Sequence, residues 1–157
     1  MTRSRVPLVS VLVTLLFGFS PLLRASDVPD AIAALRGTVT YVDFWAGWCA
    51  PCAESFPWLN RMQAKYGAQG LRVVGVGLDA ETSKGDRFLK AHPPAFAIVR
   101  DPVGALAERY GVEGMPYSLL LDEQGRVIHR HVGYRSDETA DYEKAIQAAL
   151  AANGAHK

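Results

Sequence analysis

Two cysteines, Cys49 and Cys52, are the residues of this chain best suited to covalent chemistry, and two residues separate them. The apolar segment 38–45 before them predicts a buried strand, and the segment after them predicts a helix that ends at Tyr66. A thiol at the N-terminus of a helix is stabilised as the thiolate, which is the form that attacks disulfides. The pattern therefore favours dithiol–disulfide exchange, with Cys49 as the attacking thiol and Cys52 as the resolving thiol.

Two other uses of this cysteine pair also fit the sequence. It could be an inert local bridge, although a bridge that closes so small a loop adds little stability. It could also be half of a metal site, because His129 and His131 lie two residues apart on one face of a predicted strand and are possible ligands for copper or zinc. We expect that strand near the sheet edge, away from the cysteines, with an exposed polar face. A four-cysteine zinc site is excluded because the chain has only two cysteines.

Strand-like and helix-like segments alternate along the rest of the chain, which predicts an α/β fold with a central mixed sheet flanked by helices. A hairpin turn is expected over residues 122–125. The expected strands cover residues 71–78, 96–99, 117–121 and 126–132, and the expected helices cover residues 81–91, 103–110 and 138–152.

Charge and length limit the classes of function that remain. The 17 basic and 16 acidic residues give a net charge of +1, which argues against nucleic acid as the main partner.

Residues 1–25 place Arg3 and Arg5 before an apolar run and contain no acidic residue. This pattern predicts a signal peptide, cleaved after Ala25, or an N-terminal membrane anchor. Residues 26–157 then form a single domain.

Two segments resemble the thioredoxin superfamily. Residues 42–52, Val-Asp-Phe-Trp-Ala-Gly-Trp-Cys-Ala-Pro-Cys, are similar to its active-site stretch, and residues 111–116, Gly-Val-Glu-Gly-Met-Pro, look like its loop with a cis proline. The basic, apolar N-terminus and the extra segment 81–99 resemble the TlpA/ResA-type thiol–disulfide proteins of the bacterial periplasm. The resemblance covers residues 38–150 and implies a thioredoxin-like fold, with a helix–strand insertion before the half that carries the cis proline.

The resemblance implies a proton-handling role for Asp43, six residues before Cys49. Thioredoxins carry a buried carboxylate there, and burial should raise its pKa so that it can take the proton of Cys52. The alternative is a buried carboxylate with no catalytic role. ResA-type members usually carry Glu at the position of Ser55 and often Asn at the position of Asp43. This chain therefore places its carboxylate as thioredoxins do.

The same resemblance implies a substrate-binding surface. A cis peptide bond before Pro116 would present the backbone of Met115 to a bound polypeptide as a short strand. Trp48 and Trp45 are expected to wall the surface around the cysteines. Tyr117 stands where Thr is commoner, and it either contacts substrates or packs at the start of a strand.

The residues between the cysteines, Ala50 and Pro51, include no histidine to stabilise the thiolate, which favours a reductant at roughly −200 to −280 mV. The expected function is an exported reductase of disulfides in periplasmic partner proteins, in cytochrome c maturation or metal-site assembly. It would take electrons from a membrane thiol donor and need no cofactor. The alternatives are a copper chaperone or metal-site binder and a peroxide-reducing relative, although the chain lacks the Pro-x-x-x-Thr-x-x-Cys pattern of the latter.

Overall fold

The computed structural model describes residue 32 and residues 35–154. The N-terminal segment 1–25, with its expected signal peptide or anchor, lies outside the described residues. Within the described part of the chain, no helix is long and apolar enough to cross a membrane.

A five-stranded mixed sheet forms the centre of the molecule, in the order β3-β2-β1-β4-β5. Strand β1 pairs in parallel with β2, which pairs in parallel with β3, whereas β4 is antiparallel to both β1 and β5. All seven residues of β1 are buried, as expected for a central strand covered on both faces. The strands are β1 (Val39–Trp45), β2 (Leu71–Gly77), β3 (Ala97–Arg100), β4 (Tyr117–Leu121) and β5 (Val127–Val132).

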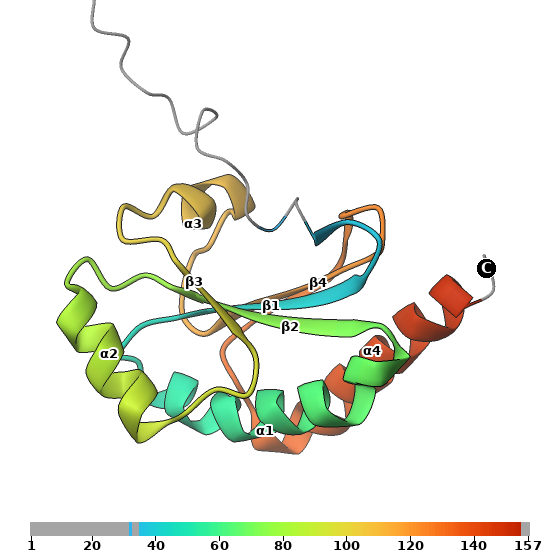
Figure 1. Cartoon of the computed structure of the whole chain (residues 1–157), viewed down its shortest axis with the longest axis horizontal. Coiled ribbons are helices and arrows are strands. Elements are labelled where there is room, and N and C mark those ends of the chain that lie inside the picture. The colour runs from blue at the N-terminus through green and yellow to red at the C-terminus, as the bar shows by residue number, and fades with distance from the viewer. Residues whose placement is uncertain (1–31, 33–34, 155–157) are drawn as a thin grey trace, which may run out of the picture.

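Helices cover both faces of this sheet, with α1, α2 and α4 on one face and α3 on the other (Figure 1). The helices are α1 (Ala50–Tyr66), α2 (Thr82–Ala91), α3 (Ala105–Tyr110) and α4 (Thr139–Gly154), with short 3-10 turns η3 (Gly67–Gln69) and η4 (Ser136–Glu138). The predicted mixed sheet flanked by helices is confirmed. So is the helix–strand insertion, which forms α2 and the edge strand β3.

Helix α3 begins two residues later than the sequence pattern predicts. Gly104 has a left-handed backbone with φ of +72°, which ends the preceding turn. The buried carboxylate of Asp101 accepts the backbone N–H groups of Leu106 at 2.9 Å and Ala107 at 3.0 Å, so it satisfies the first turn of the helix.

Trp45 lies inside the core, and the expectation that it walls the active-site surface is wrong. Its side chain is completely buried and stacks on Phe88 of α2, with ring centroids 4.9 Å apart. Gly77 of β2 leaves the room for this indole, since a Cβ there would lie 2.9 Å from the Trp45 ring. Trp45 therefore joins the insertion helix to the sheet directly before the cysteine loop.

Candidate active site

Cys49 and Cys52 form a disulfide at the junction of β1 and α1. The backbone turns sharply after β1, where the N–H of Cys49 donates to the carbonyl of Ala46 at 3.0 Å. Cys49 is 4% exposed, whereas Cys52 is fully buried. Of the two cysteines, Cys49 is therefore the one that a partner can reach at the surface, and Cys52 is the inner one.

The N-terminus of α1 favours a negative charge on Cys49. Cys49 is the N-cap residue, it makes no side-chain capping hydrogen bond, and no acidic residue occupies the first turn. The free N–H groups and the helix dipole therefore act on the sulfur without a competing carboxylate. After reduction of the disulfide, the same N–H groups and dipole would favour the thiolate form of Cys49.

Asp43 lies in the middle of β1, on the face of the sheet that α1 covers. It is 1% exposed, and its Oδ1 atom accepts the hydroxyl of Ser118 at 2.6 Å. The two residues are direct partners in the antiparallel pairing of β1 with β4, so their side chains share a face. The other carboxyl oxygen, Oδ2, is buried without a hydrogen-bond partner among the described residues.

Burial raises the pKa of Asp43 to about 7, because a carboxylate in this apolar surrounding loses its hydration. The hydroxyls of Ser118 and Ser55 oppose this shift by favouring the charged form. The direction is the one expected from the sequence. A carboxyl group that titrates near neutral pH can both accept and return a proton under ordinary conditions.

Ser55 connects the cysteine loop to this carboxyl group. It lies one turn into α1, is 2% exposed, and donates its hydroxyl to the carbonyl of Cys52 at 3.0 Å. The same hydroxyl opposes the rise in the pKa of Asp43. Ser55 stands where ResA-type proteins usually carry Glu, so Asp43 is the carboxyl group of this part of the core.

The peptide bond between Met115 and Pro116 is cis. Pro116 directly precedes β4 and is buried, and its carbonyl accepts the N–H of Gly133 at 2.7 Å. Met115 is half-buried and packs against the core cluster that contains both cysteines. The second sequence landmark thus comes to the same part of the molecule as the first.

Tyr117 does not reach this surface. It is 3% exposed and packs edge-on against Phe44, with ring centroids 6.3 Å apart, in the core on the other face of the sheet. Of the two expectations for Tyr117, packing agrees with the structure and substrate contact does not. Trp48, by contrast, is 71% exposed next to Cys49, as expected for a surface residue of the site.

The sequence did not indicate two residues that belong to this site. Ser118 donates its hydroxyl to the Asp43 carboxyl, and the sequence gives no signal for this, because only the pairing register of β4 with β1 brings the two side chains together. Asp79 follows the carboxyl end of β2, is 6% exposed, and accepts the N–H of Gly47 at 2.8 Å, which fixes the loop before Cys49. Polar residues at the carboxyl ends of parallel strands often lie beside a site, and this was its only signal.

The histidines give no support to the alternative of a metal site. They lie on the edge strand β5, beyond β4, and no group of three or more His, Cys, Asp or Glu residues among the described residues could hold a metal ion. The expected exposure of both residues is wrong for His131, which is half-buried and stacks on Tyr142 with ring centroids 4.1 Å apart. Burial lowers the pKa of His131 to about 4.

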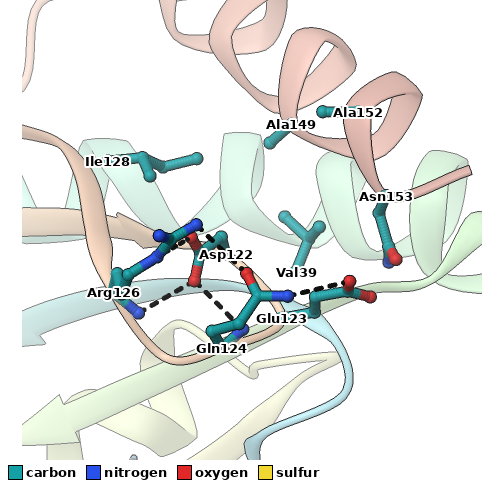
Figure 2. Close-up of a pocket in the computed structure, with 9 residues that line it drawn as sticks. All are labelled: Val39, Asp122, Glu123, Gln124, Arg126, Ile128, Ala149, Ala152 and Asn153. Carbon is teal, nitrogen blue, oxygen red and sulfur yellow. Dashed lines mark hydrogen bonds and ion pairs between the residues drawn. The ribbon is translucent and has the colours of Figure 1, made fainter. Parts of the chain in front are cut away.

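A pocket of about 210 Å³ lies at the other end of the sheet, between the β4–β5 hairpin and the end of α4 (Figure 2). Figure 2 shows Arg126 bound to Asp122 on one side and Asn153 on the other. No cysteine lines this pocket, and Val39 at the start of β1 forms part of its wall. Because the cysteines follow the opposite end of β1, this pocket takes no part in their chemistry.

Comparisons with known proteins agree with this geometry. The profile of the Redoxin family matches residues 16–146. The DsbE homologue of Paracoccus denitrificans, a thiol:disulfide interchange protein, is 37% identical over 73% of this chain and 63% of its own length. The thiol-disulfide oxidoreductase ResA of Bacillus thuringiensis is 29% identical over 66% of this chain and 60% of its own length. The chain thus spans less than two thirds of these relatives.

Solved structures give the same relationship at the level of the fold. A Chlorobium tepidum protein assigned as the thiol:disulfide interchange protein DsbE matches with a TM-score of 0.74 and 48% identity, over 76% of this chain and 84% of its own. StoA from Bacillus subtilis matches with a TM-score of 0.59 and 27% identity, over 68% and 82% of the two chains. The fold is thioredoxin-like, and the chain belongs to the Redoxin family.

Proposed function

We propose that this protein is a thiol–disulfide oxidoreductase that reduces disulfides in partner proteins. The observation that carries the proposal is the Cys49–Cys52 disulfide at the open N-terminus of α1, next to a buried carboxyl group that titrates near neutral pH. Relatives named as thiol-disulfide oxidoreductases support the same chemistry.

The reaction proceeds in two exchanges. The Cys49 thiolate attacks one sulfur of the partner's disulfide, a mixed disulfide forms, and the partner's other sulfur leaves as a thiolate that takes up a proton. The sulfur of Cys52 then attacks Cys49, the enzyme's disulfide forms, and the partner's second thiol is released. Two electrons and two protons pass from the dithiol to the partner, so the enzyme must be reduced again by a thiol donor.

Asp43 acts in the second exchange. Cys52 is fully buried and must lose its proton before it can attack, and Asp43 is the titratable carboxyl in the same buried set. Its unpartnered Oδ2 atom has the free lone pairs to receive that proton, directly or through a water molecule. Cys49 needs no such base, because the helix N-terminus already favours its thiolate.

The finer assignments belong to the same proposal. We infer export to the periplasm from the basic and apolar residues 1–25, with anchoring to the membrane if that segment is retained. A membrane thiol carrier would supply the electrons, and the partners would be proteins of cytochrome c maturation or metal-site assembly. Mass spectrometry of the protein purified from its own cells tests the first step, since a chain that begins at Ser26 shows cleavage and a retained segment in the membrane fraction shows anchoring.

Reduction of insulin by dithiothreitol tests the activity. The wild type should accelerate it, Cys49→Ser should abolish the acceleration, and Cys52→Ser should accumulate as a mixed disulfide through Cys49. Unchanged acceleration by Cys49→Ser would overturn the proposal. Equilibration of the wild type with graded dithiothreitol ratios then fixes the direction, since a potential near −120 mV would indicate an oxidant rather than a reductase.

A further inference from the structure

An open groove of about 400 Å³ runs beside the disulfide, between the exposed ring of Trp48 and helix α2. Its apolar surface comes from Trp48, Phe88 and Ala91, and its polar surface comes from Lys84, Arg87 and His92. Trp48 is 71% exposed, so a large apolar side chain faces solvent directly before the attacking cysteine. Exposed aromatic surface at such a position indicates contact with a partner.

The groove and the cis-proline loop flank Cys49 from opposite sides. Helix α2 follows β2, Pro116 precedes β4, and these two strands lie on either side of β1 in the sheet. A polypeptide joined to Cys49 and lying along Met115 on one side would therefore continue over the groove on the other.

The groove is fixed in place relative to the cysteines. The N–H of Gly47 donates to Asp79 at 2.8 Å, and a Cβ at Gly47 would lie 2.8 Å from the carbonyl oxygen of Lys84. The cysteine loop and α2 thus pack backbone against backbone. A segment bound in the groove would meet a preformed surface, which reduces the entropy lost on binding.

The charge of the groove is positive. No carboxylate lines it, whereas Lys84 and Arg87 are both exposed along one side. Lys84 is paired with the exposed Glu81 at 2.9 Å, and Asp86, the acidic residue of α2, is paired with Arg100. Arg87 forms no ion pair within the described part of the chain, so its guanidinium is available to a carboxylate of a partner.

We propose that this groove binds an acidic segment of the partner protein, next to the cysteine that forms the mixed disulfide with Cys49. The proposal rests on the proposed function and adds to it the chemical class of the substrate. Apolar residues of the segment would pack on Trp48, and a carboxylate would pair with Arg87. Acidic partners would then react faster than basic ones, because complementary charge raises the rate of encounter.

Mixed-disulfide formation by the Cys52→Ser variant tests this without turnover. The probes are three peptides whose single cysteine is joined to thionitrobenzoate and is flanked by two Glu, two Gln or two Lys residues. Cys49 attacks the peptide sulfur, and released thionitrobenzoate reports the rate. Arg87→Glu is added to the variant as the test, and Arg130→Glu on β5 serves as the matched control, because it changes the same charge at the opposite edge of the sheet.

At low ionic strength the Glu peptide should react about fivefold faster than the Lys peptide, and added salt should shrink this difference. Arg87→Glu should reverse the order, and Arg130→Glu should leave it unchanged. Equal rates for the three peptides, or equal effects of the two substitutions, would overturn the groove assignment and leave the proposed function standing. No release from any peptide would remove Cys49 as nucleophile and overturn both.

Discussion

Replacing Asp43 with Asn should stabilise the oxidised protein, and the gain should grow as pH rises from 4 to 7. The folded chain raises the pKa of this carboxyl from its ordinary 3.8 to about 7 through burial. The folded state therefore holds a proton that the unfolded state has already lost. The stability contributed by the protonated carboxyl is complete below pH 3.8 and is lost as pH rises through 7.

The size of the effect follows from that pKa difference. One pH unit of differential protonation corresponds to 1.36 kcal/mol, so a difference of about three pH units corresponds to about 4 kcal/mol. Asn has nearly the same shape, is neutral at every pH, and can still accept the hydroxyl of Ser118. The free energy of unfolding of the variant should therefore exceed that of the wild type by an amount that rises by about 1.4 kcal/mol per pH unit and levels off above pH 7.

Guanidinium unfolding of both oxidised proteins at pH 4.5, 6, 7 and 8, followed by tryptophan fluorescence, measures this difference. The buried Trp45 and Trp58 report the loss of the core. Asp141→Asn is the matched control, because it makes the same chemical change at an exposed carboxyl of α4. A difference for Asp43→Asn that is the same at pH 4.5 and pH 8 would refute the reasoning, since Asp43 would then be charged in the folded state throughout.

Two neighbouring groups give further measurable consequences. Ser118→Ala should raise the pKa of Asp43 further, because it removes a hydroxyl that donates to the carboxylate at 2.6 Å, and an unmoved titration midpoint in ¹³C NMR of the carboxyl carbon would contradict this. His131→Phe should protect the protein from acid, because burial lowers the pKa of His131 from 6.5 to about 4 and its stabilising contribution is lost as pH falls through that window. His129 adds to this lowering of the pKa and Glu138 opposes it. Because the ring is partly exposed, we expect the wild type to lose about 1 kcal/mol more of its unfolding free energy than the variant between pH 7 and pH 4.5. The Tm of each protein, measured at both pH values, follows this loss.

The sequence predicted the cysteine junction well because its signals are local. A run of β-branched and aromatic residues, then two cysteines around a proline, defines a strand, a turn and a helix with little help from the rest of the chain. The burial of Asp43 followed from the same run, since a single carboxylate among apolar strand residues has no exposed position to occupy.

The roles on β4 could not be predicted in the same way. All five residues of Tyr-Ser-Leu-Leu-Leu are buried, so the strand lacks the alternation that shows which face each side chain takes. A shift of one residue would exchange Tyr117 and Ser118 between the two faces. Only the pairing of Ser118 with Asp43 decides this, and it sends Tyr117 into the opposite core.

Three buried carboxyl groups, Asp43 within β1, Asp79 after β2 and Asp101 after β3, differ in the groups that they bind. Asp101 accepts two N–H groups at the start of α3, and Asp79 accepts the N–H of Gly47, so each holds a segment of backbone in place. Asp43 holds no backbone group and pairs with no cation within the described part of the chain, and it accepts the hydroxyl of Ser118. A neutral amide would meet that structural need with greater stability at neutral pH, whereas a carboxylic acid also offers a proton that can move. This contrast supports the proposal that Asp43 serves as the base for the buried thiol of Cys52.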